Sequence, residues 1–267
     1  MWISRYVCMF LIYSYLGWLF ETSLCTVKCG KWENRGFLYG PVVPIYGAGA
    51  LAITVVVDLT AQKGIVYSPW SIYCISVLGS AVLEYITSWA MEKIFHALWW
   101  DYSGLPLNVQ GRISLFTSLG FGIAGLVIVY AIVPLLERFM NNIPSILIEL
   151  LSLCLVFLFA VDVTVTVTAL HHFDRIVIRV DESFNQSMTY LVDGVMQRTN
   201  QVKQGIRTKR AAVAEELNTM SDFAKKAVHR VYIFRDKDER IQAAKNKLLS
   251  VVKSINRNNK PDDTDDG

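Results

Sequence analysis

Ionisable and amide side chains within or beside strongly apolar segments are the candidates for chemistry in this sequence. Such groups are costly in an apolar setting, and they usually pair inside a helix bundle or face a water-filled cavity. In those positions they contact a solute or pass on a proton or cation. The eight candidates for substrate binding are Glu21, Asn34, Arg35, Glu84, Glu92, Asp101, Asn108 and Arg112.

Glu84 and Asp162 lie farthest from the ends of their apolar segments. Two interpretations stay open for them. Each can be a structural group that is hydrogen-bonded to a neighbouring helix, or each can belong to a relay or a substrate contact.

The stretch 31–47 combines charge, an amide, aromatic rings, glycine and proline between two apolar runs. Irregular backbone at membrane depth is tolerated only inside protein or beside water. Gly36, Gly40 and Pro41 let the backbone break, and such a break can present backbone amides to an anionic group. Arg35 adds a planar, forked donor that suits carboxylate or phosphate. The stretch is therefore predicted to form one wall of a polar site.

Motifs of soluble catalysis are missing from the sequence. There is no G-x-x-x-x-G-K-[ST] P-loop, no G-x-S-x-G and no H-E-x-x-H, so we expect no catalytic residue and no ATPase site. The five cysteines lack a matching His/Cys pair, so neither a zinc site nor another cofactor is expected. Acidic residues lie between the basic ones, which argues against a nucleic-acid surface.

Three glycine-containing stretches lie in apolar runs, at 47–50, 79–81 and 120–125. The last spells G-x-G-x-x-G, but no soluble strand precedes it, as a dinucleotide site would require. Small residues also let helices approach closely. We therefore expect the second, third and fourth apolar segments to pack tightly.

Five apolar stretches reach the roughly 20 residues that a helix needs to cross the hydrocarbon core. They run over about 2–27, 42–59, 70–91, 113–136 and 143–169. Residues 1–170 contain only 8 of the 26 Lys and Arg and 9 of the 23 Asp and Glu. The sequence thus predicts an all-α, polytopic membrane helix bundle over 1–170, followed by an aqueous tail.

The tail, 171–256, has apolar residues at intervals of three and four with charged residues between them. This pattern predicts amphipathic helices that form a hairpin or short coiled coil, with interruptions near Gly194, Gly205 and 235–238. The tail can pack on itself, join copies of the chain in a homo-oligomer, or bind a cytoplasmic protein. Residues 257–267 are acidic, lack apolar periodicity and are expected to be disordered.

Basic residues mark one side of the predicted membrane. The first and third loops and the tail are richer in Lys and Arg than the second and fourth loops, which contain only Lys63 and Arg138. The tail is therefore expected in the cytoplasm and the N-terminus outside. The same orientation brings most of the candidates to a cytoplasm-facing site. The cluster 99–103 reads either as an interfacial aromatic anchor or as a wall of that site, with Asp101 paired to Arg35 or Arg112.

Several long blocks resemble the putative type IV ABC-transporter family of bacteria, the CmpB-like permeases. The blocks are Tyr13–Thr22, Asn34–Pro41, Pro44–Gly47, Leu83–Tyr85, Met91–Lys93, Trp99–Ser103, Asn108 and Gly111–Ile113. The resemblance implies a multi-pass, permease-like subunit in the bacterial cytoplasmic membrane and names no substrate. It does not extend to the tail.

Three functions remain open at this point. A transport subunit would need a separate ATPase chain, or would act as a secondary carrier through Glu84. A non-transporting scaffold or regulatory protein would use its tail to bind a cytoplasmic partner. An intramembrane enzyme acting on lipid could use Glu84, Asp101 and Arg35, but the sequence shows no nucleophile–base pair.

Overall fold

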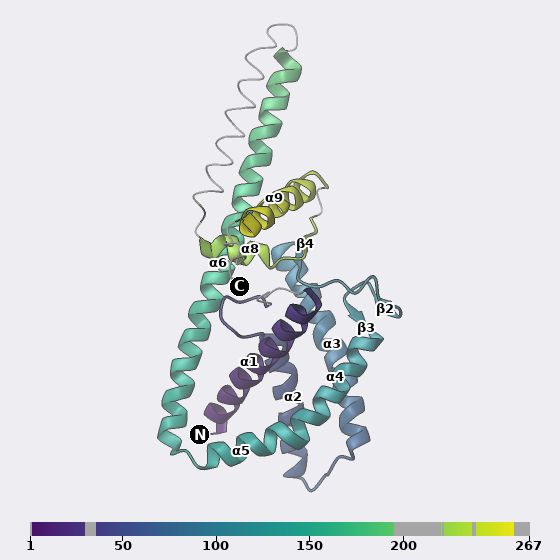
Figure 1. Ribbon diagram of the computed structural model, residues 1–267, viewed down its shortest axis with the longest axis vertical. Coiled ribbons are helices and arrows are strands. Elements are labelled where there is room, and N and C mark those ends of the chain that lie inside the picture. The colour runs from purple at the N-terminus through teal and green to yellow at the C-terminus, as the bar shows by residue number, and fades with distance from the viewer. Residues whose placement is uncertain (1, 30–35, 195–219, 221, 237–238, 259–267) are drawn as a thin grey trace, which may run out of the picture. The chain divides into compact units, whose positions relative to one another are not determined.

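The computed structural model describes residues 2–29, 36–194, 220, 222–236 and 239–258 (Figure 1). The chain divides into two compact units. The N-terminal unit consists of Met1–Ile94 and Trp99–Thr164, and the C-terminal unit consists of Phe95–Leu98 and Val165–Gly267. The domain boundaries expected at 170 and 256 remain predictions.

Helices account for most of the described chain. They are α1 (Trp2–Cys29), α2 (Pro44–Ala61), α3 (Pro69–Phe95), α4 (Leu115–Val127), the π-helical η1 (Ile128–Ile132), α5 (Val133–Asn141), α6 (Ser145–Gly194), α8 (Asp222–His229) and α9 (Glu239–Asn258). Within the described residues, five helical stretches are long and apolar enough to cross a membrane: Trp2–Val27, Pro44–Ala61, Pro69–Phe95, Leu115–Asn141 and Ser145–Arg175. The predicted all-α fold with five apolar spans is confirmed.

Large apolar side chains cover the outer surface of the spanning helices. On α3, Leu78, Val82 and Ile86 are 68%, 59% and 55% exposed, and their spacing of four residues places them on one helical stripe. On α6, Leu153 and Phe157 are exposed in the same way. Contiguous apolar surface of this kind is rare in water and is the ordinary surface of a helix that faces lipid.

Close packing of small residues joins α1 to α2, which lie side by side (Figure 1). A Cβ atom added to Gly47 would lie 2.7 Å from the carbonyl oxygen of Phe10 and would also collide with the Ser14 hydroxyl. The backbone N–H of Val43, just before α2, donates to the Ser14 carbonyl at 3.0 Å. Gly17 is covered by Tyr46 in the same crossing. Gly47 therefore packs against α1.

Glycines in the other predicted stretches are used unequally. Gly122 and Gly125 of α4 face α3, where Tyr73 and Ser76 fill the space that a Cβ would take. Gly79 and Gly120 have no other atom within 4 Å of such a Cβ. Of these four glycines, only Gly122 and Gly125 contribute to the expected close approach of the third and fourth spans.

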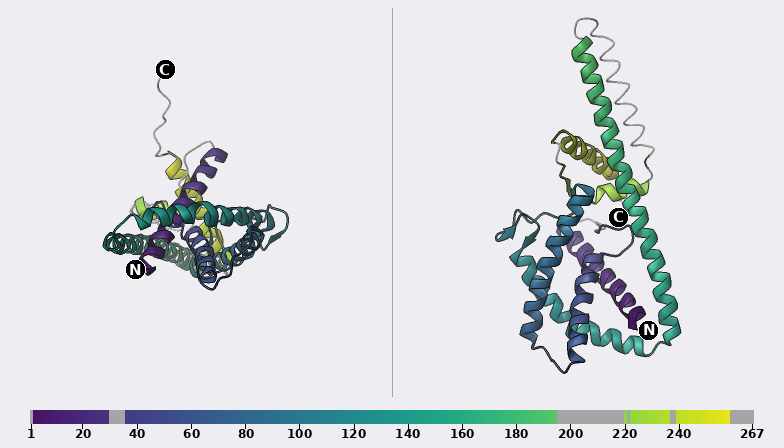
Figure 2. Two further views of the ribbon diagram at one scale, coloured as in Figure 1. Left: turned by 90° about the horizontal axis from the view of Figure 1, so that it is seen from below. Right: turned by 180° about the vertical axis from the view of Figure 1, so that it is seen from behind.

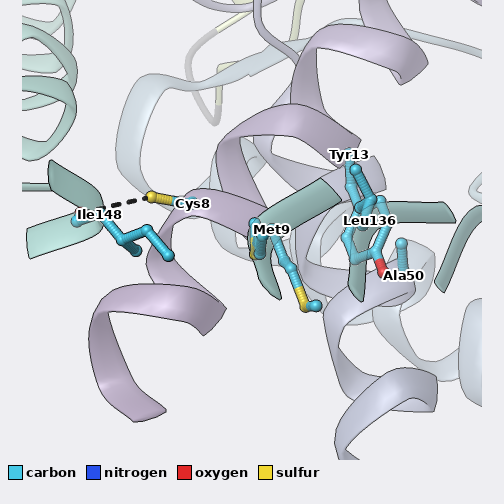
Figure 3. Packing of buried hydrophobic residues seen from close by; sticks show 7 residues of the cluster. Cys8, Met9, Tyr13, Ala50, Leu136 and Ile148 are labelled. Atoms are coloured by element: carbon cyan, nitrogen blue, oxygen red, sulfur yellow. Dashed lines mark hydrogen bonds between the residues drawn. The ribbon is translucent and has the colours of Figure 1, made fainter. Parts of the chain in front are cut away.

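An apolar cluster also ties α1 to α2, α5 and α6 (Figure 3). Its buried members are Cys8, Met9, Tyr13, Ala50, Leu136, Met140 and Ile148. The Tyr13 hydroxyl lies 3.2 Å from the Thr54 hydroxyl, which in turn donates to the Ala50 carbonyl at 2.8 Å. The phenol therefore has a hydrogen-bond partner inside the apolar cluster.

The fourth span contains the π-helical segment η1. Pro134 follows it, and a proline inside a helix lacks an N–H and crowds the carbonyl four residues earlier. The N–H of Val133 bonds to the carbonyl of Ile128, five residues back, so the helix widens by one residue before the proline. This local widening lets the span continue from α4 into α5 without a break.

The C-terminal unit contains a two-stranded antiparallel sheet of β1 (Ala97–Leu98) and β4 (Ile233–Phe234). In Figure 2, α8 and α9 appear in light green and yellow. Helix α6 continues past His171, where the sequence composition changes, so the span and the start of the tail form one helix. The predicted interruption near 235–238 falls between β4 and α9, and residues 237–238 of it lie outside the described residues. Residues 195–219 and 259–267 lie outside the described residues, so the hairpin or coiled coil and the disordered end remain predictions.

Lys245 is a buried charged residue of the C-terminal unit, and only 1% of its surface is exposed. Its ammonium group forms ion pairs with Asp174 and with Asp236, the latter at 2.8 Å, and lies 5.9 Å from the centre of the Phe234 ring. A buried cation requires such partners because losing its hydration is costly. Lys245 thus connects α6, the segment that follows β4, and α9.

We predict that Gly47→Ala destabilises the N-terminal unit by about 1–3 kcal/mol, because the added methyl group must separate α1 from α2. Thermal unfolding of the purified protein in detergent measures the effect. Gly79→Ala is the matched control, since nothing lies near its new Cβ and alanine favours a helix by up to about 1 kcal/mol. Equal unfolding midpoints for the two variants would contradict the packing described here.

We predict that Lys245→Met destabilises the C-terminal unit by about 3 kcal/mol, because it leaves the Asp174 and Asp236 carboxylates without their shared cation. Limited proteolysis of the full chain is the measurement, and faster cleavage within 222–258 is expected. Lys247→Met is the control, because Lys247 is exposed on the same helix. Equal cleavage rates for the two variants would show that the ion pairs do not hold the unit.

Candidate functional site

Six of the eight predicted site residues fall within the described part of the chain. Glu21 lies on α1, Glu84 and Glu92 lie on α3, and Asp101, Asn108 and Arg112 lie in the connection between α3 and α4. Asn34 and Arg35 lie outside the described residues, so their place in the site remains a prediction.

Glu84 is the most deeply buried of the six, with 6% of its surface exposed. The Tyr102 hydroxyl donates a hydrogen bond to Glu84 Oε1 at 3.2 Å. Glu84 Oε2 is buried and accepts no hydrogen bond from any residue that the structure describes. In the described part of the chain no ion pair involves this carboxyl group. One of its two oxygens is therefore left to accept a hydrogen bond or to contact a cation.

Tyr102 keeps its proton and acts as a donor. Burial, followed by the negative charge of Glu84, raises the pKa of the Tyr102 phenol above its usual value. The charge of Glu21 acts in the same direction. The hydroxyl group is consequently protonated throughout the physiological range, as its hydrogen bond to Glu84 requires.

Glu21 and Tyr46 complete this group of side chains. Tyr46 on α2 lies close enough to Glu21 on α1 for the two to interact, and Glu21 interacts electrostatically with Glu84 and with Tyr102. We call Glu21, Tyr46, Glu84 and Tyr102 the Glu84 cluster. It joins three helices and the connection after α3. Two predicted residues are thus brought together. The two tyrosines come from the stretches 31–47 and 99–103, which the sequence offered as walls of the site without naming either tyrosine as a site residue.

Arg112, in the connection after α3, contacts a second group of side chains, and these lie on α3. Its guanidinium pairs with the Glu92 carboxylate, donates to the Ser88 hydroxyl at 3.3 Å and lies 5.7 Å from the centre of the Tyr85 ring. Of the two partners offered for Asp101, Arg112 is instead paired with Glu92, and Arg35 lies outside the described residues, so that pair remains a prediction. These contacts fasten the connection after α3 onto the helix.

Asp101 and Asn108 shape the same connection from within. The N–H of Ser103 donates to Asp101 Oδ1 at 2.9 Å, and the N–H of Gly111 donates to Asn108 Oδ1 at 3.1 Å. The N–H of Tyr102 donates to the Gly111 carbonyl at 2.8 Å. Both predicted residues thus satisfy backbone groups and help to position Tyr102.

The connection also contains a short hairpin of β2 (Asn108–Val109) and β3 (Ile113–Ser114). Between the strands, Gln110 and Gly111 have φ angles of 55° and 70°. A side chain at position 111 would be disfavoured by this left-handed backbone and would collide with Asp101 Oδ1. Glycine is therefore required at position 111, and its carbonyl oxygen accepts the hydrogen bond from the N–H of Tyr102.

Asp162 of α6 holds the irregular segment before α2. The N–H of Tyr39 donates to Asp162 Oδ1 at 2.9 Å and the N–H of Gly40 donates to Oδ2 at 2.8 Å. A Cβ on residue 40 would lie 2.7 Å from Oδ2, which explains the glycine. The segment does present amides to an anion, as the sequence suggested, and the anion is the chain's own carboxylate. Of the two open interpretations, the geometry here is that of a structural group.

The Glu84 cluster can bind a positively charged or hydrogen-bond-donating group. A search of the described residues finds no group of three His, Cys, Asp or Glu side chains that could hold a metal ion. A buried acceptor without a partner costs about 1–3 kcal/mol. A donor or cation that reaches Glu84 Oε2 would recover that free energy.

We predict that Asp162→Asn releases the segment 36–43, because an amide can accept from only one of the two N–H groups and turns a donor toward the other. Amide hydrogen exchange of the peptides covering 36–43 should rise about tenfold, the factor that matches a loss of about 1.4 kcal/mol. Thr164→Ala, at an exposed position on the same helix, is the control. Unchanged exchange at Tyr39 and Gly40 would refute the assigned bonds.

Comparisons with known proteins identify the family of this chain. No curated protein and no solved structure matches the chain. One family model matches residues 8–167, which contain all the described members of the Glu84 cluster as well as Asp162, and its description is Putative ABC-transporter type IV. The match extends over more than half of the chain and confirms the resemblance found in the sequence. With its five apolar spanning helices, the chain is a membrane protein and belongs to the putative ABC-transporter type IV family.

Proposed function

We propose that this chain is the permease-like, membrane-embedded subunit of a transporter, and that the Glu84 cluster contacts the transported solute or its coupling ion. The observation that carries the proposal is the buried Glu84 Oε2, which lacks a hydrogen-bond partner among the described residues. A purely structural carboxylate in an apolar bundle would be expected to have both oxygens satisfied, as Asp162 does.

The position of the cluster fits that role. Glu21 lies near the end of α1, Tyr46 near the start of α2, and Glu84 in the second half of α3. Because consecutive spanning helices run in opposite directions, these positions lie toward the same side of the membrane, with Glu84 the deepest of the three. Ionisable groups at such a depth are found on ion and substrate pathways. The distribution of Lys and Arg favours a cytoplasm-facing site, with the N-terminus outside and the tail inside.

Energy for transport would come from another polypeptide. The sequence has no P-loop, so ATP would be hydrolysed on a separate ATPase subunit. Membership of the family supports an ATPase as the partner. The C-terminal unit offers a compact surface on which such a subunit could dock.

A non-transporting scaffold is the second candidate. The observation that favours it is the separate compact C-terminal unit, with its own buried ion pairs, outside the residues that the family model matches. In this alternative the tail binds a cytoplasmic protein or a second copy of the chain, and the Glu84 cluster only holds the helices together.

Substitution of Glu84 separates the two functions. In a strain that lacks the wild-type gene, we predict that Glu84→Gln fails to restore the lost phenotype although the protein is made and folded. The amide keeps the shape of the side chain but removes the charge that a cation or donor would meet. Glu137→Gln is the control, because it removes one carboxylate from an exposed position of the same unit and should restore the phenotype.

Purification of the intact chain from mild detergent completes the test. The transport proposal predicts a co-purifying protein with a P-loop and measurable ATP hydrolysis, for wild type and for Glu84→Gln alike. A silent Glu84→Gln variant, combined with loss of the phenotype on deletion of 171–256, would instead establish the scaffold.

A further inference from the structure

Strand β1 occupies a particular place in the chain. Ala97 and Leu98 follow directly after α3, which contains Glu84, and precede the segment 99–103, which contains Tyr102. They pair with β4 in the register Ala97 to Phe234 and Leu98 to Ile233. Strand β4 therefore bonds to the stretch of backbone between Glu84 and Tyr102, the two residues of the cluster that share a hydrogen bond.

The pairing is longer and more buried than two residues suggest. The N–H of Tyr232 donates to the Leu98 carbonyl at 2.7 Å, and the N–H of Arg235 donates to the His96 carbonyl at 2.6 Å. Ala97 is 0% exposed and Leu98 is 4% exposed. Buried backbone groups of this kind are costly to separate from their partners.

Strand β4 is itself held by α9 and α6. The side-chain amide of Asn246 accepts from the N–H of Phe234 at 2.9 Å and donates to the Phe234 carbonyl at 3.1 Å. The Phe234 ring stacks on Phe173 with centroids 5.4 Å apart. Lys245, next to Asn246, pairs with Asp236, two residues after β4. The position of β4 thus depends on the fold of the C-terminal unit.

The segment between β1 and Tyr102 is short and is fastened at both ends. At its far end Tyr102 is bonded to Gly111, and the Trp100 indole donates to the Arg112 carbonyl at 3.0 Å. At its near end the fastening is β1 itself. If β4 separates from β1, the segment 99–102 loses its attachment at the β1 end, while the Trp99 ring keeps its edge contact with Phe37.

From this geometry we infer that β4 is a clamp on β1 through which the C-terminal unit controls the order of segment 99–103 and the hydrogen bond from Tyr102 to Glu84. A protein that binds the C-terminal unit and shifts β4 would weaken the hydrogen bond from Tyr102 to Glu84 Oε1, and so loosen the carboxyl group whose other oxygen is the proposed solute contact. The use of this control in transport rests on the proposed function, whereas the clamp itself does not.

Amide hydrogen exchange on the full chain in detergent tests the clamp. Asn246→Ala removes both bonds to the Phe234 backbone and should raise exchange in peptides covering 231–236 and in peptides covering 99–103, each by about tenfold. Peptides from α1 and α2 should keep their wild-type rates. Ser250→Ala, at an exposed position of α9, is the control and should change neither segment.

A lock provides the converse variant. Leu98→Cys combined with Ile233→Cys places a pair of thiols at directly opposed positions of the two strands, where a disulfide is geometrically allowed. Mass spectrometry of the oxidised protein identifies the bridge. Closing it in the Asn246→Ala background should return exchange at 99–103 to within about twofold of the wild-type rate.

Three results would overturn the inference. Exchange that rises at 231–236 while 99–103 stays protected would show that the strands are not coupled. Unchanged exchange at 231–236 would show that Asn246 does not hold β4. A bridge that fails to restore protection at 99–103 would show that β1 is not the point of control. None of these measurements needs a solute or an ATPase. A failed transport test would therefore not contradict the clamp.

Discussion

The arrangement of the N-terminal unit depends on one constraint, the need of each carboxylate in an apolar bundle for hydrogen-bond donors from the protein itself. Asp162 receives two backbone N–H groups, and Glu92 receives the Arg112 guanidinium. Glu84 receives a single hydroxyl, from Tyr102, and keeps one buried oxygen without a donor. This difference singles out Glu84 among carboxylates that composition alone makes equivalent.

The same constraint accounts for the irregular backbone around the site. The segment before α2 is not helical, so its N–H groups need acceptors, and Asp162 supplies them from a distant helix. In the connection after α3, the side chains of Asp101 and Asn108 accept hydrogen bonds from nearby backbone N–H groups. The hairpin of β2 and β3 pairs further backbone groups with each other. Polar residues that look like a substrate site in the sequence are therefore divided in the structure between shaping the backbone and lining the cluster.

Prediction from the sequence succeeded where the signal was length and composition. Five apolar runs predicted five helices of sufficient length, and Gly36, Gly40 and Pro41 predicted the break before α2. It missed Tyr46 and Tyr102 as partners of the acidic residues, because an aromatic ring near a span end is also a common interfacial anchor.

Long-range pairings could not be predicted in the same way. Strands of two residues have no periodicity, so nothing in the sequence linked Ala97 with Phe234. Arg112 had several acidic residues within reach, and only the fold shows that Glu92 is its partner. The amphipathic pattern of the tail predicted helices but not the buried ion pairs of Lys245, since a lysine in such a pattern is usually solvent-exposed.

A double-mutant cycle between Glu84→Gln and Tyr102→Phe, measured by thermal unfolding of the full chain in detergent, tests the central claim most directly. If the phenol donates to a carboxylate that has no other donor, the two substitutions are coupled by about 0.5–3 kcal/mol. The destabilisation of the double variant is then clearly different from the sum of the two single effects. Additive effects would show that the two side chains do not interact and that Tyr102 does not hold the Glu84 carboxyl group.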